Sequence, residues 1–237
     1  LSFGFRGEAL ASIASVSRFS LASYHIDDEH GWLYQQEGDD VTNRILRPQH
    51  MKQGTVITVR DLFFNTPVRK RFLKSERREA ELIENIIKKL ALAHPNIGFG
   101  FTKNGKTTKK YLPTESLLSR TESVLGAVYQ GQLDAIEVSV AGVDIFGYVS
   151  SPALSRHSGD MQYLFINQRP IKDPAISHAV KRAYQDVLYQ QRYPVFSLHF
   201  RMDPTQVDVN IHPSKELVRF ADQKSMIQVL SKAVHDV

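Results

Sequence analysis

The sequence predicts an α+β fold, because hairpin signals and amphipathic helix patterns both occur along the chain. Asn104-Gly105 and Ala141-Gly142 each separate two runs of alternating apolar residues, as the tight turns of β-hairpins do. Apolar residues at 82–90 and 176–188 instead recur every three or four positions, which is the period of a helix with one buried face. Strands and helices are therefore expected to pack together in layers.

The composition is that expected of a soluble globular protein. With 42% hydrophobic residues in 237, the chain can bury substantial cores. It contains no cysteine, so no disulfide and no cysteine-bound zinc is expected, and no other metal signature occurs among its nine histidines. No apolar run approaches the roughly 20 residues that span a bilayer, and the first residues do not resemble a signal peptide. We expect a cytoplasmic protein without a membrane partner.

The first half of the chain predicts two hairpins and one long helix. Residues 19–23 and 32–36 alternate as antiparallel strands around an acidic turn at 27–29, and the β-branched residues 54–59 predict a buried central strand. Thr66-Pro67 is typical of a helix start with a hydroxyl cap. A helix with one buried face follows from Glu79 and ends at His94-Pro95, before a hairpin at 97–111.

A change of composition at residues 112–116 predicts a domain boundary, giving domains 1–115 and 116–237. In the second domain we expect a short helix ending near Gly126, a hairpin around Ala141-Gly142, and a strand at 163–166 followed by a turn. A helix at 175–189, strands at 196–202 and 207–211, and a closing helix from about Asp222 complete the prediction.

The segment GFRGEAL at residues 4–10 predicts a loop that leads into a helix. Two glycines three positions apart allow a tight turn, and free N–H groups at the start of the next helix favour an anion such as phosphate. An ordinary loop remains the alternative. Lys215, in a loop after a strand, could act as a point charge on a phosphate, or it could be only a solvated surface lysine.

The charge of the chain is +5, and the basic residues cluster. Residues 69–78, called the basic segment below, contain six cations and one acid, and the cations are Arg69, Lys70, Arg71, Lys74, Arg77 and Arg78. The predicted hairpin adds Lys103, Lys106, Lys109 and Lys110. Such a cluster is either a solvated helix face or a surface for the nucleic-acid backbone.

Four blocks of sequence resemble the MutL mismatch-repair proteins, members of the gyrase, Hsp90, histidine kinase and MutL (GHKL) ATPase superfamily. GFRGEALASI at 4–13 is similar to the ATP-lid motif, and Gly54-Thr55 opens a strand. DLFFNTPVRKRFL at 61–73 and QVDVNIHPSK at 206–215 are long enough to distinguish MutL from its superfamily relatives. The blocks occur in the family's order and cover the chain almost from end to end.

The resemblance implies a fold and a set of sites. Domain 1–115 would be the C-terminal part of a GHKL-type ATPase α/β sandwich, and 116–237 a ribosomal-protein-like α/β transducer domain. The resemblance implies ATP with Mg as cofactors and a nucleotide-switched matchmaker in DNA mismatch repair. Its partners would be DNA, MutS, a downstream nuclease and helicase, and a second copy in an ATP-dependent homodimer. The implied ATP-binding residues are Gly4, Phe5, Arg6, Gly7, Thr55 and Lys215.

Two departures from the family pattern limit which of the family's site residues can be assigned to this chain. The family's water-activating glutamate and magnesium-binding asparagine precede the lid, and no match to them precedes Leu1. No residue of this chain is therefore assigned a catalytic or metal-binding role, and the chain as given is expected not to hydrolyse ATP, although the intact protein would. The family's arginine-rich loop after its Asn-x-Arg turn is reduced to Lys172.

The basic segment and the lysine hairpin, meaning Lys103, Lys106, Lys109 and Lys110, are therefore the preferred phosphate contacts, and Lys172 is assigned to DNA binding as well. The alternatives are a nucleic-acid-binding module without a usable nucleotide site, which would bind DNA with or without ATP, and another GHKL ATPase.

Overall fold

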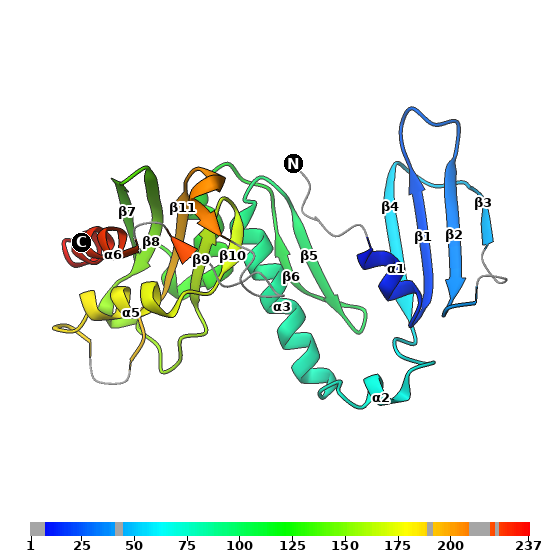
Figure 1. Ribbon diagram of the computed structural model, residues 1–237, viewed down its shortest axis with the longest axis horizontal. Coiled ribbons are helices and arrows are strands. Elements are labelled where there is room, and N and C mark those ends of the chain that lie inside the picture. The colour runs from blue at the N-terminus through cyan, green and yellow to red at the C-terminus, as the bar shows by residue number, and fades with distance from the viewer. Residues whose placement is uncertain (1–7, 41–44, 189–191, 209–218, 221–222) are drawn as a thin grey trace. The chain divides into compact units, whose positions relative to one another are not determined.

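A computed structural model describes residues 8–40, 45–188, 192–208, 219–220 and 223–237 (Figure 1). The chain forms two compact units, Leu1–Glu79 and Ala80–Val237, and each is described by itself. The second unit includes the hairpin before residue 112, which the sequence assigned to the first domain. The domain boundary near residue 115 stays a prediction.

The first unit is an antiparallel sheet with one short helix, α1 (Ala9–Ala14), packed against β1. Its strands are β1 (Arg18–Tyr24), β2 (Gly31–Glu37), β3 (Ile45–Gln49) and β4 (Gly54–Arg60), in the spatial order β3-β2-β1-β4. The predicted hairpin of β1 and β2 is confirmed, with Leu21 opposite Tyr34. The sequence analysis did not anticipate β3, because its five residues include a proline and show no alternation.

The prediction of a buried central strand at 54–59 is wrong for the residues described. β4 is a strand, but it lies at the edge of the described sheet and pairs only with β1 there. Val56, Ile57 and Val59 are 58%, 46% and 41% exposed. A β-branched run indicates strand conformation because these side chains suit a pleated surface, whereas burial depends on which elements lie over it.

The predicted hydroxyl cap at Thr66 is also wrong. The short helix α2 (Pro67–Lys70) does begin with proline, yet Thr66 makes no side-chain cap bond, and its Oγ1 is buried without a described partner. The next helix, α3 (Glu76–Ala93), is capped by Ser75, whose Oγ accepts a hydrogen bond from the Arg78 N–H at 3.4 Å. Glu79 Oε1 in turn accepts from the Lys74 N–H at 2.9 Å.

Only one end of α3 is buried. Residues 91–93 are 0–3% exposed, whereas Leu82, Ile83 and Ile86 are 36–57% exposed, so the prediction of one continuous buried face is wrong. After α3, β5 (Phe99–Lys103) and β6 (Lys106–Tyr111) form the expected hairpin. Asn104 and Gly105 take φ values of 49° and 76°, which a two-residue turn of this kind requires.

The second unit is built on a five-stranded mixed sheet. Its strands are β7 (Leu133–Val140), β8 (Val143–Ser150), β9 (Gln162–Ile166), β10 (Arg169–Ile171) and β11 (Phe196–Arg201), in the order β10-β9-β11-β8-β7. β11 runs parallel to β9 and antiparallel to β8. A two-stranded pair, β12 (Val207–Asp208) with β13 (Arg219–Phe220), stands apart from this sheet.

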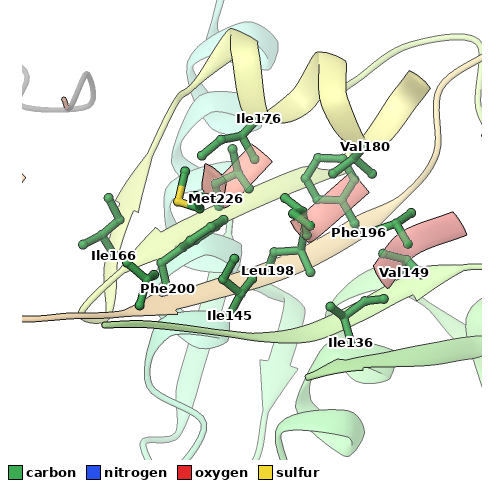
Figure 2. Close-up of a cluster of buried hydrophobic side chains, with 14 of the residues drawn as sticks. Ile136, Ile145, Val149, Ile166, Ile176, Val180, Phe196, Leu198, Phe200 and Met226 are labelled. Atoms are coloured by element: carbon green, nitrogen blue, oxygen red, sulfur yellow. The ribbon is translucent and has the colours of Figure 1, made fainter. Parts of the chain in front are cut away.

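Helices α5 (Pro174–Ala183) and α6 (Gln223–His235) cover one face of this sheet (Figure 1). Figure 2 shows side chains of β8 and β11, including Ile145 and Leu198, gathered beneath Ile176 of α5. The predicted closing helix is confirmed. The helix expected at 175–189 ends earlier, at Ala183, where Lys181 and Arg182 occupy the favourable last turn.

The opposite face of the sheet packs against α4 (Leu117–Leu125) and the buried end of α3. Because successive residues of a strand point to opposite faces, Leu164 of β9 enters one core and Phe165 the other. Arg120 of α4 is 1% exposed. Its Nη2 donates to the carbonyls of Pro95 (2.6 Å), Ile97 (2.9 Å) and Leu112 (2.8 Å), which joins the turn after α3 to the residue after β6.

Replacing Arg120 with methionine should lower the free energy of unfolding by about 3 kcal/mol, because three carbonyls lose their donor at once. Urea unfolding followed by circular dichroism measures this change. Arg182→Met, at an exposed position of α5, is the matched control and should change stability by less than about 0.5 kcal/mol. Equal stability of the two variants would show that Arg120 does not hold these turns.

His199 on β11 is 6% exposed and stacks between two rings, with centroids 5.4 Å from Phe146 and 4.6 Å from Phe165. Burial lowers the pKa of His199 to about 4 from an ordinary 6.5. The folded state therefore favours the neutral imidazole.

The folded pKa of His199 lies below the unfolded one, so its contribution to stability is complete above pH 6.5 and is lost as the pH falls toward 4. The loss should approach about 3 kcal/mol, from 1.36 kcal/mol for each pKa unit. Urea titrations at pH 7, 6, 5 and 4 should show a smaller loss for His199→Leu than for the wild type. Parallel pH dependence in both proteins would contradict the assignment.

Candidate functional site: the end of α1 and the basic segment

Most of the predicted ATP-binding residues lie outside the described part of the chain. These are Gly4, Phe5, Arg6, Gly7 and Lys215. Thr55 is described: it lies on β4, and its hydroxyl is 2.9 Å from Ser23 Oγ on β1. The helix predicted to follow the glycine motif is present as α1, and Glu8 occupies its N-cap position without a side-chain hydrogen bond.

Three successive carbonyls in the connection between α1 and β1 accept hydrogen bonds from other segments. Ser15 O accepts from Asn65 Nδ2 at 2.9 Å, Val16 O from the Phe63 N–H at 2.7 Å, and Ser17 O from the Gly38 N–H at 3.0 Å. Neither the helix nor the sheet supplies donors in this connection, so the contacts satisfy carbonyls that would otherwise need water. They fix the end of α1 to the loop at 61–66 and to the end of β2.

The loop at 61–66 has a backbone that its residue types disfavour. Asp61 and Phe63 adopt positive φ values of 50° and 65°, and a bulky aromatic residue rarely does so. Arg18 of β1 supports the loop, with Nη1 3.4 Å from the Asp61 carboxylate and its guanidinium 5.6 Å from the centre of the Phe64 ring. Such a conformation persists only where the surrounding contacts determine it.

The basic segment begins four residues after Asn65, and all six of its cations are exposed. Arg69 and Lys70 belong to α2, Arg71 follows it directly, and Arg77 and Arg78 lie in the first turn of α3. The structure therefore brings the predicted DNA-binding residues 69–78 together on one helix–loop–helix segment. The lysine hairpin is partly neutralised, because Lys109 Nζ is 3.6 Å from Glu84.

Glu84 of α3 also pairs with Lys88 at 3.0 Å. Burial alone would raise the pKa of Glu84, but the hydrogen bonds and charges of Lys88 and Lys109 hold it below its ordinary value. The carboxylate is therefore ionised at neutral pH. This makes Lys109 a weaker candidate for phosphate than the exposed cations of the basic segment.

Lys172 is exposed between β10 and α5, in the second unit. It lines a cavity of about 340 Å³ together with Lys89 of α3, Asp160 and Asp173. Asp173 is the N-cap of α5 and accepts from the N–H groups of residues 175 and 176. The cavity carries charges of both signs, so the local electrostatics favour phosphate less than the basic segment does.

Sequence reasoning missed two residues of these sites. Asn65 lies within a recognised block, but only the fold shows that its amide reaches α1, fifty positions earlier. Nothing in the sequence distinguishes Lys89 from its neighbour Lys88. Its place beside Lys172 depends on the packing of α3 against the sheet. Across the described residues, no group of three or more metal-ligating side chains could hold a metal ion. None of the described helices is long and apolar enough to cross a membrane.

Comparisons with known proteins agree with the sequence blocks. The family model for the DNA mismatch repair protein, C-terminal domain, matches residues 121–237. The DNA mismatch repair protein MutL of Cellvibrio japonicus is 40% identical over 235 residues, which cover 98% of this chain and 37% of that protein. The chain thus spans little more than a third of the length of the curated relatives it matches.

Solved structures confirm the fold class. The MutL ATPase domain of Aquifex aeolicus, complexed with ADP, matches with a TM-score of 0.73 and 27% identity over 97% of this chain and 77% of that chain. The B-subunit of DNA gyrase from Myxococcus xanthus matches with a TM-score of 0.52 and 13% identity over 96% of this chain and 68% of that one, a likeness of fold alone. From its sequence blocks, its relatives and its mixed α/β fold, the chain belongs to the MutL family of DNA mismatch repair proteins.

Proposed function

We propose that this chain acts in DNA mismatch repair by binding the DNA backbone and ATP, as a nucleotide-switched matchmaker. The observation that carries the proposal is the exposed basic segment. The loop at 61–66 precedes this segment, and its Asn65 is hydrogen-bonded to Ser15, the residue that follows α1. The proposed partners are MutS, a downstream nuclease and helicase, and a second copy of the chain when ATP is bound.

The electrostatics of α3 support DNA as the ligand of the basic segment. Arg77 and Arg78 lie at the N-terminal end of the helix, where the macrodipole is positive and cations are unfavourable. The macrodipole therefore does not favour these two cations at this end of α3. A nearby phosphate would offset the repulsion, and contacts of this kind bind the backbone without reading base sequence.

The proposed nucleotide site combines residues from both halves of the chain. Gly4, Phe5, Arg6 and Gly7 would enclose the phosphates before α1, Thr55 would contribute a hydroxyl, and Lys215 would place its ammonium on the terminal phosphate. The relative from Aquifex aeolicus, which holds ADP, supports the class of ligand. Bound magnesium would neutralise phosphate charge, and no described residue of this chain is assigned to hold it.

Charge reversal at Arg71 and Lys74 should weaken DNA binding on the order of tenfold or more at 0.1 M salt. Two lost phosphate contacts should also reduce the slope of log K against log salt by about 2. Fluorescence anisotropy with duplex DNA at several salt concentrations measures both. The matched control is Lys224→Glu with Lys232→Glu, which makes the same charge change at exposed positions of α6. Equal losses in both double variants would mean that net charge alone matters.

Replacing Lys215 with alanine should weaken ATP binding by the full-length gene product about tenfold, because a point charge on the terminal phosphate is lost. Isothermal titration calorimetry measures the affinity, and Lys224→Ala is the control. A wild-type protein that binds DNA equally well with and without ATP, and binds no nucleotide, would instead be a nucleic-acid-binding module.

A further inference from the structure

The two edges of the five-stranded sheet differ in how open they are to a further strand. β10 has three residues and contains Arg169 and Pro170, and a short edge strand with a cation and a proline resists the addition of another strand. β7 has eight residues, contains no cation and no proline, and pairs with β8 without a bulge. Among the described residues no strand pairs with the outer side of β7, which lies at the margin of the sheet (Figure 1).

The turn between β7 and β8 decides which backbone groups of β7 point outward. Residues 141–142 form a two-residue turn with φ values of 49° and 78°, and the residues that flank such a turn exchange both backbone hydrogen bonds. Val140 is one of that pair, so the even-numbered residues of β7 bond to β8. The carbonyl of Gln132, which accepts from the Ser151 N–H at 3.2 Å, continues this alternation. The odd-numbered residues of 133–139 therefore direct their N–H and C=O groups away from the sheet.

The charges on β7 indicate the class of partner. Asp134 and Glu137 are its only charged residues, both are exposed, and neither forms an ion pair with a described cation. Because they lie three positions apart, their side chains project from opposite faces of the sheet. Arg201 of β11 is separated from this edge by β8, where it lies opposite Asp144. β7 is thus an acidic edge on both faces.

The apolar side chains of β7 are incompletely covered. Ile136 is buried in the core beneath α6, whereas Val138 and Val140, on the same face of the strand, are only partly buried at the rim of that core. Side chains on a neighbouring strand lie directly beside their cross-strand partners. Apolar residues of an added strand would therefore cover this rim.

We propose that β7 binds an extended, basic segment of a partner protein by strand addition. The added strand pairs its backbone with the odd-numbered residues of β7 and places two cations, three positions apart, opposite Asp134 and Glu137. An apolar side chain between the two cations extends the core beneath α6. A second copy of β7 does not meet this requirement, because it has no cation to place there. The proposal does not rest on the proposed binding of ATP and DNA.

The test uses the fluorescein-labelled peptide TVKVTKT as probe. In antiparallel pairing it places its lysines opposite Glu137 and Asp134, and its valines opposite Ile136 and Val138. Fluorescence anisotropy with the full-length gene product should show saturable binding. The peptide TVEVTET should bind at least about tenfold more weakly, because both opposite-charge pairs become like-charge pairs. N-methylation of the third and fifth residues of TVKVTKT should cause a similar loss without changing its charge, because these two N–H groups donate to β7.

Two variants place the peptide on β7. Ala135→Pro removes an outward N–H group and no hydrogen bond to β8, so it should leave the fold intact and weaken TVKVTKT binding about tenfold. Glu137→Lys should bind TVKVTKT weakly and the charge-swapped peptide TVEVTKT more tightly. Glu115→Lys makes the same charge change at an exposed position outside the sheet, and it should bind both peptides as the wild type does.

The proposal is overturned if the wild type does not bind TVKVTKT, or if N-methylation leaves the affinity unchanged. Equal affinity of Ala135→Pro and the wild type also overturns it. Circular dichroism shows whether Ala135→Pro is folded, and if it is not, the N-methylated peptide makes the same test on the unchanged protein. Self-association of the wild type in sedimentation experiments, abolished by Ala135→Pro, would instead assign the edge to a second copy of the chain and would overturn the proposal as well.

Discussion

Backbone carbonyls that helices and strands leave unpaired are the constraint on which this structure depends. Each such group costs free energy when it is buried without a donor, so the fold must bring a donor to it. In the second unit Arg120 supplies one guanidinium to three carbonyls from two turns. In the first unit three carbonyls between α1 and β1 receive donors from two distant segments. Both solutions join parts of the chain that secondary structure alone would leave separate.

The two solutions differ in what they achieve. Arg120 is buried and its contacts join packed elements, so its role is the stability of the core between α3, α4 and the sheet. Asn65 lies at the surface of its unit, between a short helix and an exposed cationic segment. Its hydrogen bond adds little to a core, but it joins the residue that follows α1 to the loop at 61–66. The same loop holds Asp61 and Phe63 at positive φ, a conformation that persists only where the surrounding contacts determine it.

In the basic segment, two cations lie where the helix macrodipole disfavours positive charge. A helix start favours acidic residues, and Glu76 and Glu79 satisfy that preference in α3, yet Arg77 and Arg78 stand beside them. Elsewhere the charges are arranged for stability: Lys181 and Arg182 occupy the last turn of α5, and Glu84 pairs with Lys88 and Lys109. This exception within an otherwise favourable pattern supports the proposal that residues 69–78 bind the DNA backbone.

The sequence by itself determined the local structure and the family. Turn residues such as Asn104-Gly105 and Ala141-Gly142 predicted their hairpins, because the left-handed backbone of these turns admits few residue types. Helical periodicity predicted α5 and α6, and four blocks of residues indicated the MutL family.

Only the tertiary structure decided which residues are buried and which distant segments contact each other. It placed β4 at an exposed edge of the described sheet, left half of the apolar face of α3 open, and brought Asn65 to Ser15. Periodicity within a segment reports the conformation of that segment, whereas burial and contact depend on elements that are distant in sequence. The joining of α1 to the basic segment could therefore be found only in the fold.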